Sequence, residues 1–101
     1  MNPKQLLSPG RIVATPGALE ACTTRYLMHC LRRHVRGDWA VVWAEDEDAH
    51  TNDEAVSLRL LILSAYPIDP DKPSNGYGNN TIWIITEADR SCTTFLLPEE
   101  Y

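Results

Sequence analysis

The sequence lacks most of the features that would assign it at once to a class of protein. No apolar run approaches the ~18 residues that a membrane span requires, and the N-terminal residues show no secretion signal. The three cysteines, Cys22, Cys30 and Cys92, form an odd set without Cys-x-x-Cys spacing. We therefore expect free thiols in a reducing cytoplasm.

Excess positive charge is also missing. A formal net charge of -5 argues against a general nucleic-acid binder, because such a protein needs a basic surface to displace counterions. Basic residues gather within 25–36, and carboxylates gather within 45–54. The composition therefore favours a protein partner over direct nucleic-acid binding or a membrane.

What remains is typical of one globular domain. The chain has 101 residues, of which 44% are hydrophobic and 23% charged. Residues 1–9 are expected to form a flexible arm, because Pro3 and Pro9 prevent regular pairing. Residues 10–14 are expected to form a short edge strand.

Helical signals dominate the next segment. Thr15 can cap a helix that begins at Pro16, and apolar residues recur at helical spacing until Gly37 ends the helix. Residues 40–43 fit either a helical turn or a strand, and 50–55 are expected to form a second, short helix. Together these signals predict one long N-terminal helix over residues 17–36.

Strand signals follow. Residues 58–66 are apolar on both alternating faces, which is typical of a central strand covered on both sides. A long loop rich in Pro, Gly and Asn covers 67–80, and residues 81–87 and 92–97 are expected to pair as a hairpin. The fold class expected is α+β, with a three- to four-stranded antiparallel sheet packed against the long helix. Trp39, Trp43, Trp83 or a partner protein could cover its second face.

One candidate catalytic set is His34, Arg90 and Thr93. His34 would be a general base, Arg90 a phosphate clamp, and Thr93 or Thr94 a transition-state donor. Each also has a structural interpretation. A histidine at a helix C-terminus favours the helix dipole, and threonines are good strand residues.

Other candidates would bind a partner rather than catalyse. Trp39, Tyr77, Asp89 and Arg90 could contact a partner, and the carboxylates of Glu45, Asp46 and Asp48 could imitate nucleic-acid phosphates. The acidic run could equally be a solvated surface, and Asp89 could simply satisfy the amides of a turn. The sequence has no calcium-loop order, no His-Glu-x-x-His arrangement and no Gly-rich phosphate loop. We therefore expect neither a metal nor a cofactor.

Several segments together resemble a family of small bacterial proteins that are often carried on plasmids, phages and integrated elements and are labelled plasmid-related or hypothetical proteins. Some members carry a restriction-modification subunit label. The resemblance spans about residues 10–101 and implies no catalytic residues. Residues 40–43 depart from the usual Gly-Asp after Trp39, and the loop at 67–80 is longer. The matching segments are Thr15–Leu19, Arg33-His34, Gly37–Trp39, Asn52-Asp53, Leu63–Tyr66, Ile82–Ser91, Thr93-Thr94 and Leu97-Pro98.

Three hypotheses remain open. The first is an acidic protein-interaction module of a mobile element that inhibits a host defence or nucleic-acid enzyme, of the anti-CRISPR or anti-restriction type. The second is a small ribonuclease-like or phosphate-binding enzyme that uses His34 and Arg90. The third is a regulatory subunit or homodimer whose paired sheets bury aromatic residues.

Overall fold

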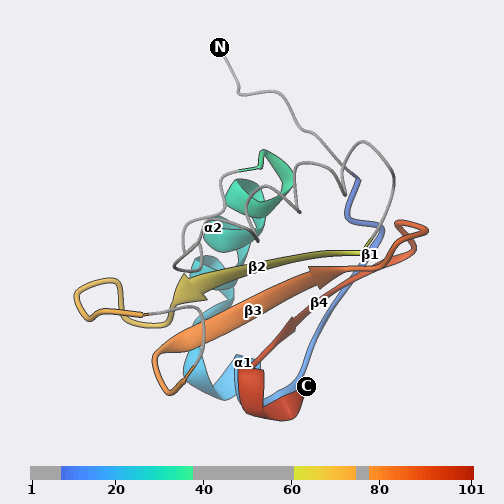
Figure 1. Ribbon diagram of the computed structural model, residues 1–101. Coiled ribbons are helices and arrows are strands. Elements are labelled where there is room, and N and C mark those ends of the chain that lie inside the picture. The colour runs from blue at the N-terminus through green and yellow to red at the C-terminus, as the bar shows by residue number, and fades with distance from the viewer. Residues whose placement is uncertain (1–7, 38–60, 75–77) are drawn as a thin grey trace.

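The computed structural model describes residues 8–37, 61–74 and 78–101. Within them, two α-helices, four strands and a short 3-10 helix form an α+β arrangement in which α2 packs against one face of the sheet (Figure 1). The expected α+β class is therefore confirmed. The predictions for residues 40–43 and for a short helix at 50–55 lie outside the described residues, as do Trp39 and Trp43.

The helical region predicted as one element is two helices, α1 (Pro16–Ala21) and α2 (Thr24–Val35). Thr15 caps α1 as expected, accepting a hydrogen bond from the Ala18 amide at 3.2 Å. The chain then becomes extended at Cys22, and the Thr23 hydroxyl accepts from the Tyr26 amide at 3.1 Å. The prediction of a single long helix is wrong because Thr23 is a second N-cap, which starts a new helix.

The sheet has the strand order β1-β4-β3-β2. β2 (Ile62–Pro67), β3 (Thr81–Thr86) and β4 (Cys92–Leu96) pair antiparallel, which confirms the predicted hairpin. β1 (Arg11–Ala14), however, runs parallel to β4, with Arg11 beside Cys92 and Ala14 beside Phe95. The sheet is therefore mixed rather than wholly antiparallel.

β2 does not occupy the central position predicted from its apolar residues. Among the described strands it lies at the end of the sheet, beside β3, and both of its faces are largely buried. The apolar residues of β2 are therefore explained by burial of both faces of the strand. Such burial does not require that β2 pairs with another strand along each of its two edges.

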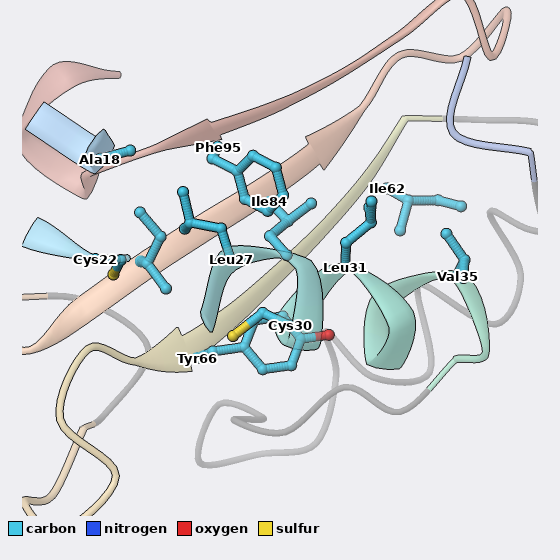
Figure 2. Close-up of a cluster of buried hydrophobic side chains, with 11 residues drawn as sticks. Ala18, Cys22, Leu27, Cys30, Leu31, Val35, Ile62, Tyr66, Ile84 and Phe95 are labelled. Carbon is cyan, nitrogen blue, oxygen red and sulfur yellow. The ribbon is translucent and has the colours of Figure 1, made fainter. Parts of the chain in front are cut away.

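The hydrophobic core lies between α2 and one face of the sheet. Figure 2 shows Leu27 and Leu31 of α2 reaching toward Ile84 and Phe95 of the sheet. These side chains form one contiguous cluster. Its buried members are Ala18, Cys22, Leu27, Cys30, Leu31, Val35, Ile62, Tyr66, Ile82, Ile84 and Phe95.

The opposite face of the sheet is also covered at its centre. Ala65, Ile85 and Leu96 are buried there. Trp83, predicted to help cover this face, pairs directly with Ala65 and Leu96 and meets the Tyr101 ring edge-on at 5.7 Å. The 3-10 helix η1 (Pro98–Glu100) brings Tyr101 to this position.

Candidate functional site

A histidine and three hydroxyl side chains meet inside the core. His34 Nδ1 lies 2.6 Å from Ser64 Oγ, and His34 Nε2 lies 2.8 Å from Thr86 Oγ1. Thr86 Oγ1 lies 2.8 Å from Thr93 Oγ1, which donates to the Pro9 carbonyl at 2.7 Å. These five residues, from the Ser64 hydroxyl to the Pro9 carbonyl, form what we call the His34 chain.

The direction of every hydrogen bond in the His34 chain follows from its last member. The Pro9 carbonyl can only accept, so the Thr93 hydroxyl donates its hydrogen to that carbonyl. Thr93 Oγ1 must then accept from the Thr86 hydroxyl. Because the Thr86 hydroxyl donates its hydrogen to Thr93, Thr86 Oγ1 must accept from His34 Nε2–H. In a neutral ring Nδ1 is consequently the acceptor, and Ser64 donates to it.

Helical spacing and cross-strand pairing place the side chains of the His34 chain. His34 lies on the face of α2 that also buries Leu27, Cys30 and Leu31, because these positions share helical spacing. Thr86 and Thr93 are direct cross-strand partners at the end of the β3–β4 hairpin, and their side chains therefore share a face.

Burial dominates the electrostatics of His34. Its side chain is 0% exposed. Burial, with a further contribution from the positive charge of Arg90, lowers the pKa of His34 to about 3. At neutral pH the ring is uncharged, and both of its nitrogens are engaged in hydrogen bonds.

The structure thus brings together two members of the predicted catalytic set and places the third nearby. His34 and Thr93 belong to one chain, and Arg90 lies near enough for its charge to act on the ring. Ser64, Thr86 and Thr93 are, however, at most 2% exposed. In this arrangement the Nδ1 lone pair of His34 faces Ser64 rather than a surface where a substrate could bind.

The Arg90 guanidinium, predicted as a phosphate clamp, contacts the backbone of its own turn. Its guanidinium Nη1 donates back to the carbonyls of Glu87 and Ala88, at 3.1 and 3.3 Å. Thr93 is buried in the His34 chain, and Thr94 pairs with Ile85 on the other face of the sheet. The hydroxyls of Thr93 and Thr94 therefore lie on opposite faces of the sheet.

Asp89 stabilises the turn itself. Its carboxylate accepts from the Ser91 amide at 2.9 Å, and hydrogen bonding by Ser91 lowers the pKa of the Asp89 carboxyl. The Arg90 amide donates to the Glu87 carbonyl at 2.9 Å and closes the turn. This geometry supports the structural interpretation of Asp89.

The part of the 67–80 loop that follows β2 is held by one side chain, Asn80. Its Oδ1 accepts from the Asp69 amide at 2.8 Å, while its Nδ2 donates to the carbonyls of Asp69, Lys72 and Pro73 at 3.1, 3.1 and 3.2 Å. Ser74 then pairs with Thr81 at 2.6 Å. Asn80 therefore fixes the path of residues 69–73 as they leave β2.

The remaining predicted binding residues, Trp39, Glu45, Asp46, Asp48 and Tyr77, lie outside the described residues. Two members of the His34 chain, Ser64 and Thr86, were missed from the sequence. The sequence did hold a signal for Ser64. It is a polar residue at the alternating positions that point into the core, because it lies between Ile62 and Tyr66 on the same face of β2. That signal shows burial but does not identify the partner.

Within residues 8–37, 61–74 and 78–101, no three His, Cys, Asp or Glu side chains are grouped so that they could hold a metal ion. Burial raises the pKa of the Cys30 thiol to about 11, and it also raises the pKa of the Cys22 thiol. Both therefore remain protonated and poorly nucleophilic at neutral pH. No helix in the described part is long and apolar enough to cross a membrane.

Comparison with known proteins gives no relative from which a role could be transferred. No family model matches the chain, and no curated protein or solved structure is significantly similar to it.

Proposed function

We propose that this protein is a small acidic protein-interaction module of a mobile genetic element, and that it inhibits a host defence or nucleic-acid enzyme by binding it. The observation that favours a binding role over an enzyme is the closure of the His34 chain. His34, Ser64, Thr86 and Thr93 satisfy one another inside the core, so that they stabilise the fold instead of facing a substrate.

The charge distribution supports binding to a basic partner. Half of the 14 carboxylates of the chain lie between Asp38 and Glu54, and only one basic residue, Arg59, lies in the whole of 38–60. A dense set of carboxylates is suited to a groove that normally accepts nucleic-acid phosphates. Glu45, Asp46 and Asp48 are the proposed binding residues.

A plating assay tests the proposal. The protein is expressed in bacteria that carry one defined type I restriction or CRISPR system, and plating of a targeted phage is measured. We expect plating to rise at least tenfold. Replacing Glu45, Asp46 and Asp48 with Gln, Asn and Asn should abolish the rise.

A matched control makes the same change in charge elsewhere. Glu20, Glu87 and Glu99 are exposed carboxylates of the described body, and their triple replacement with Gln should leave the rise intact. If no defence system is relieved and no complex forms with its enzyme, the proposal is wrong.

The ribonuclease alternative has one observation in its favour, the electrostatic proximity of Arg90 to His34. It requires the His34 ring to reach RNA, whereas the ring is fully buried with both nitrogens bonded. Incubating purified protein with RNA decides between the two. Cleavage that is lost in His34→Ala while the variant stays folded would favour the enzyme.

A further inference from the structure

The His34 chain is the main polar feature of an otherwise apolar interface. Five polar or charged side chains are buried among the described residues, and four of them belong to this chain. It connects α2 to β2, β3 and β4 and ends on the Pro9 carbonyl just before β1. Its integrity therefore couples the helix to the strands of the sheet.

All hydrogen bonds of the His34 chain can form together when the His34 ring is neutral. With neutral His34, each hydroxyl donates once along the chain, and no buried side-chain N or O atom in the described residues lacks a partner. A second ring proton would make Nδ1 a donor facing the Ser64 hydroxyl, which already donates to it. Ser64 would have to turn its hydrogen away into surroundings where it is itself only 2% exposed.

Within residues 8–37, 61–74 and 78–101, the groups that face the ring do not compensate for a positive charge. β2, β3 and β4 present the neutral hydroxyls of Ser64, Thr86 and Thr93. Along α2, Cys30 lies one turn before His34 and is a neutral thiol, and Arg33 stacks over the Tyr66 ring at 5.3 Å. The turn between β3 and β4 contributes Arg90, whose charge disfavours a second cation.

We infer that the His34 chain is an acid-sensitive latch, which holds α2 on the sheet at neutral pH and releases it when His34 takes up a proton. Unfolded chains bind that proton near pH 6.5, whereas the folded protein resists it to about pH 3. Between these values the unfolded state binds more protons, so stability must fall as the pH falls. The latch does not depend on the identity of any partner.

Urea unfolding between pH 7.5 and 5.0 tests the latch, with tryptophan fluorescence as the signal. For wild type we expect the unfolding equilibrium constant, extrapolated to water, to rise about 30-fold over this interval because of His34 alone. His34→Gln keeps an amide donor for Thr86 but cannot titrate. The increase in the unfolding equilibrium constant of this variant over the same pH interval should therefore be about 30-fold smaller than that of wild type.

His29 supplies the matched control, because it is an exposed histidine on the same helix. His29→Gln should retain the wild-type pH dependence. If His34→Gln and wild type show the same dependence, the latch is refuted.

A second measurement keeps the inference testable if His34→Gln does not fold. Long-range ¹H–¹⁵N NMR of the wild-type rings at pH 7 and pH 5.5 should show folded His34 as the neutral Nε2–H tautomer at both values. A folded-state imidazolium at pH 5.5, or an Nδ1–H tautomer at pH 7, would overturn it.

Discussion

Gly10 and Arg90 meet backbone to backbone where the chain enters β1 beside the β3–β4 turn. Both residues have left-handed conformations, with φ of 65° and 62°. A Cβ added to Gly10 would lie 2.3 Å from the Arg90 carbonyl oxygen and 2.6 Å from the Ser91 carbonyl. The parallel pairing of β1 with β4 begins directly after this contact, with the Arg11 amide donating to the Ser91 carbonyl at 2.9 Å.

Replacing Gly10 with Ala should therefore destabilise the protein by about 3 kcal/mol, from backbone strain and the contact with Arg90 together. Gly78→Ala is the control, since its φ is +93° but, apart from its chain neighbours, no atom of the described residues lies within 4 Å of the added Cβ. It should cost only the strain, about 1–2 kcal/mol. Urea unfolding of both variants measures the difference, and equal losses would show that the contact with Arg90 does not matter.

Arg90 itself permits a test of backbone strain at a residue other than glycine. Arg90→Gly and Arg90→Ala both remove the guanidinium bonds to Glu87 and Ala88. Only Gly adopts the positive φ without strain, so Arg90→Gly should be the more stable variant by about 1 kcal/mol. Thermal unfolding of the pair measures this difference. A more stable Arg90→Ala would mean that the turn changes conformation in the variants.

Local signals in the sequence predicted most elements of the described fold. The Thr15 cap, the Gly37 end and the hairpin between β3 and β4 all depend on residues close together in the chain. The break at Cys22 was missed because Leu19, Cys22 and Tyr26 keep helical spacing across it. The parallel partner of β1 was missed because β4 is about 80 residues away in the sequence, and a four-residue strand carries no signal for its direction.

The candidate site was predictable only in part, for a related reason. His34 could be placed on a helix, but its helical spacing with Leu27 and Leu31 does not show that its ring is fully buried. Its partners Ser64 and Thr86 are 30 and 52 positions away. Only the packing of α2 across β2 and β3 selects the hydroxyls that meet the ring, and therefore the chemistry that His34 can perform.

Thr93 and Thr94 provide the sharpest test of the His34 chain, because adjacent residues of β4 point to opposite faces. Thr93→Val keeps the shape but leaves the buried Thr86 hydroxyl without its acceptor, which should cost about 2 kcal/mol. The Thr94 hydroxyl has one hydrogen-bond partner among the described residues, the Cys92 sulfur at 3.8 Å. Thr94→Val should change stability by less than about 0.5 kcal/mol. Equal effects in urea unfolding would contradict the chain.

Glu100 fastens the end of the described chain to the start of α1, although it is exposed. Its Oε1 accepts from the Thr15 hydroxyl at 2.5 Å and from the Leu97 amide at 2.8 Å, and its Oε2 accepts from the Gly17 amide at 3.2 Å. The hydrogen bond from Thr15, followed by the one from Leu97, lowers the pKa of the Glu100 carboxyl. Its contribution to stability should therefore be complete above the pKa of an unfolded glutamate and disappear as the pH falls through the lower folded value.

Glu100→Gln should accordingly lower the Tm at pH 7 by a few degrees and reduce the loss of Tm between pH 6 and pH 3. The amide cannot accept at both of its terminal atoms, so either the Thr15 and Leu97 bonds or the Gly17 bond must weaken. Glu99→Gln changes the same charge on the neighbouring exposed residue and should leave both quantities near wild type. Calorimetry at the two pH values distinguishes the variants. If Glu99→Gln matches Glu100→Gln, the effect comes from overall charge and the fastening of η1 to α1 contributes nothing.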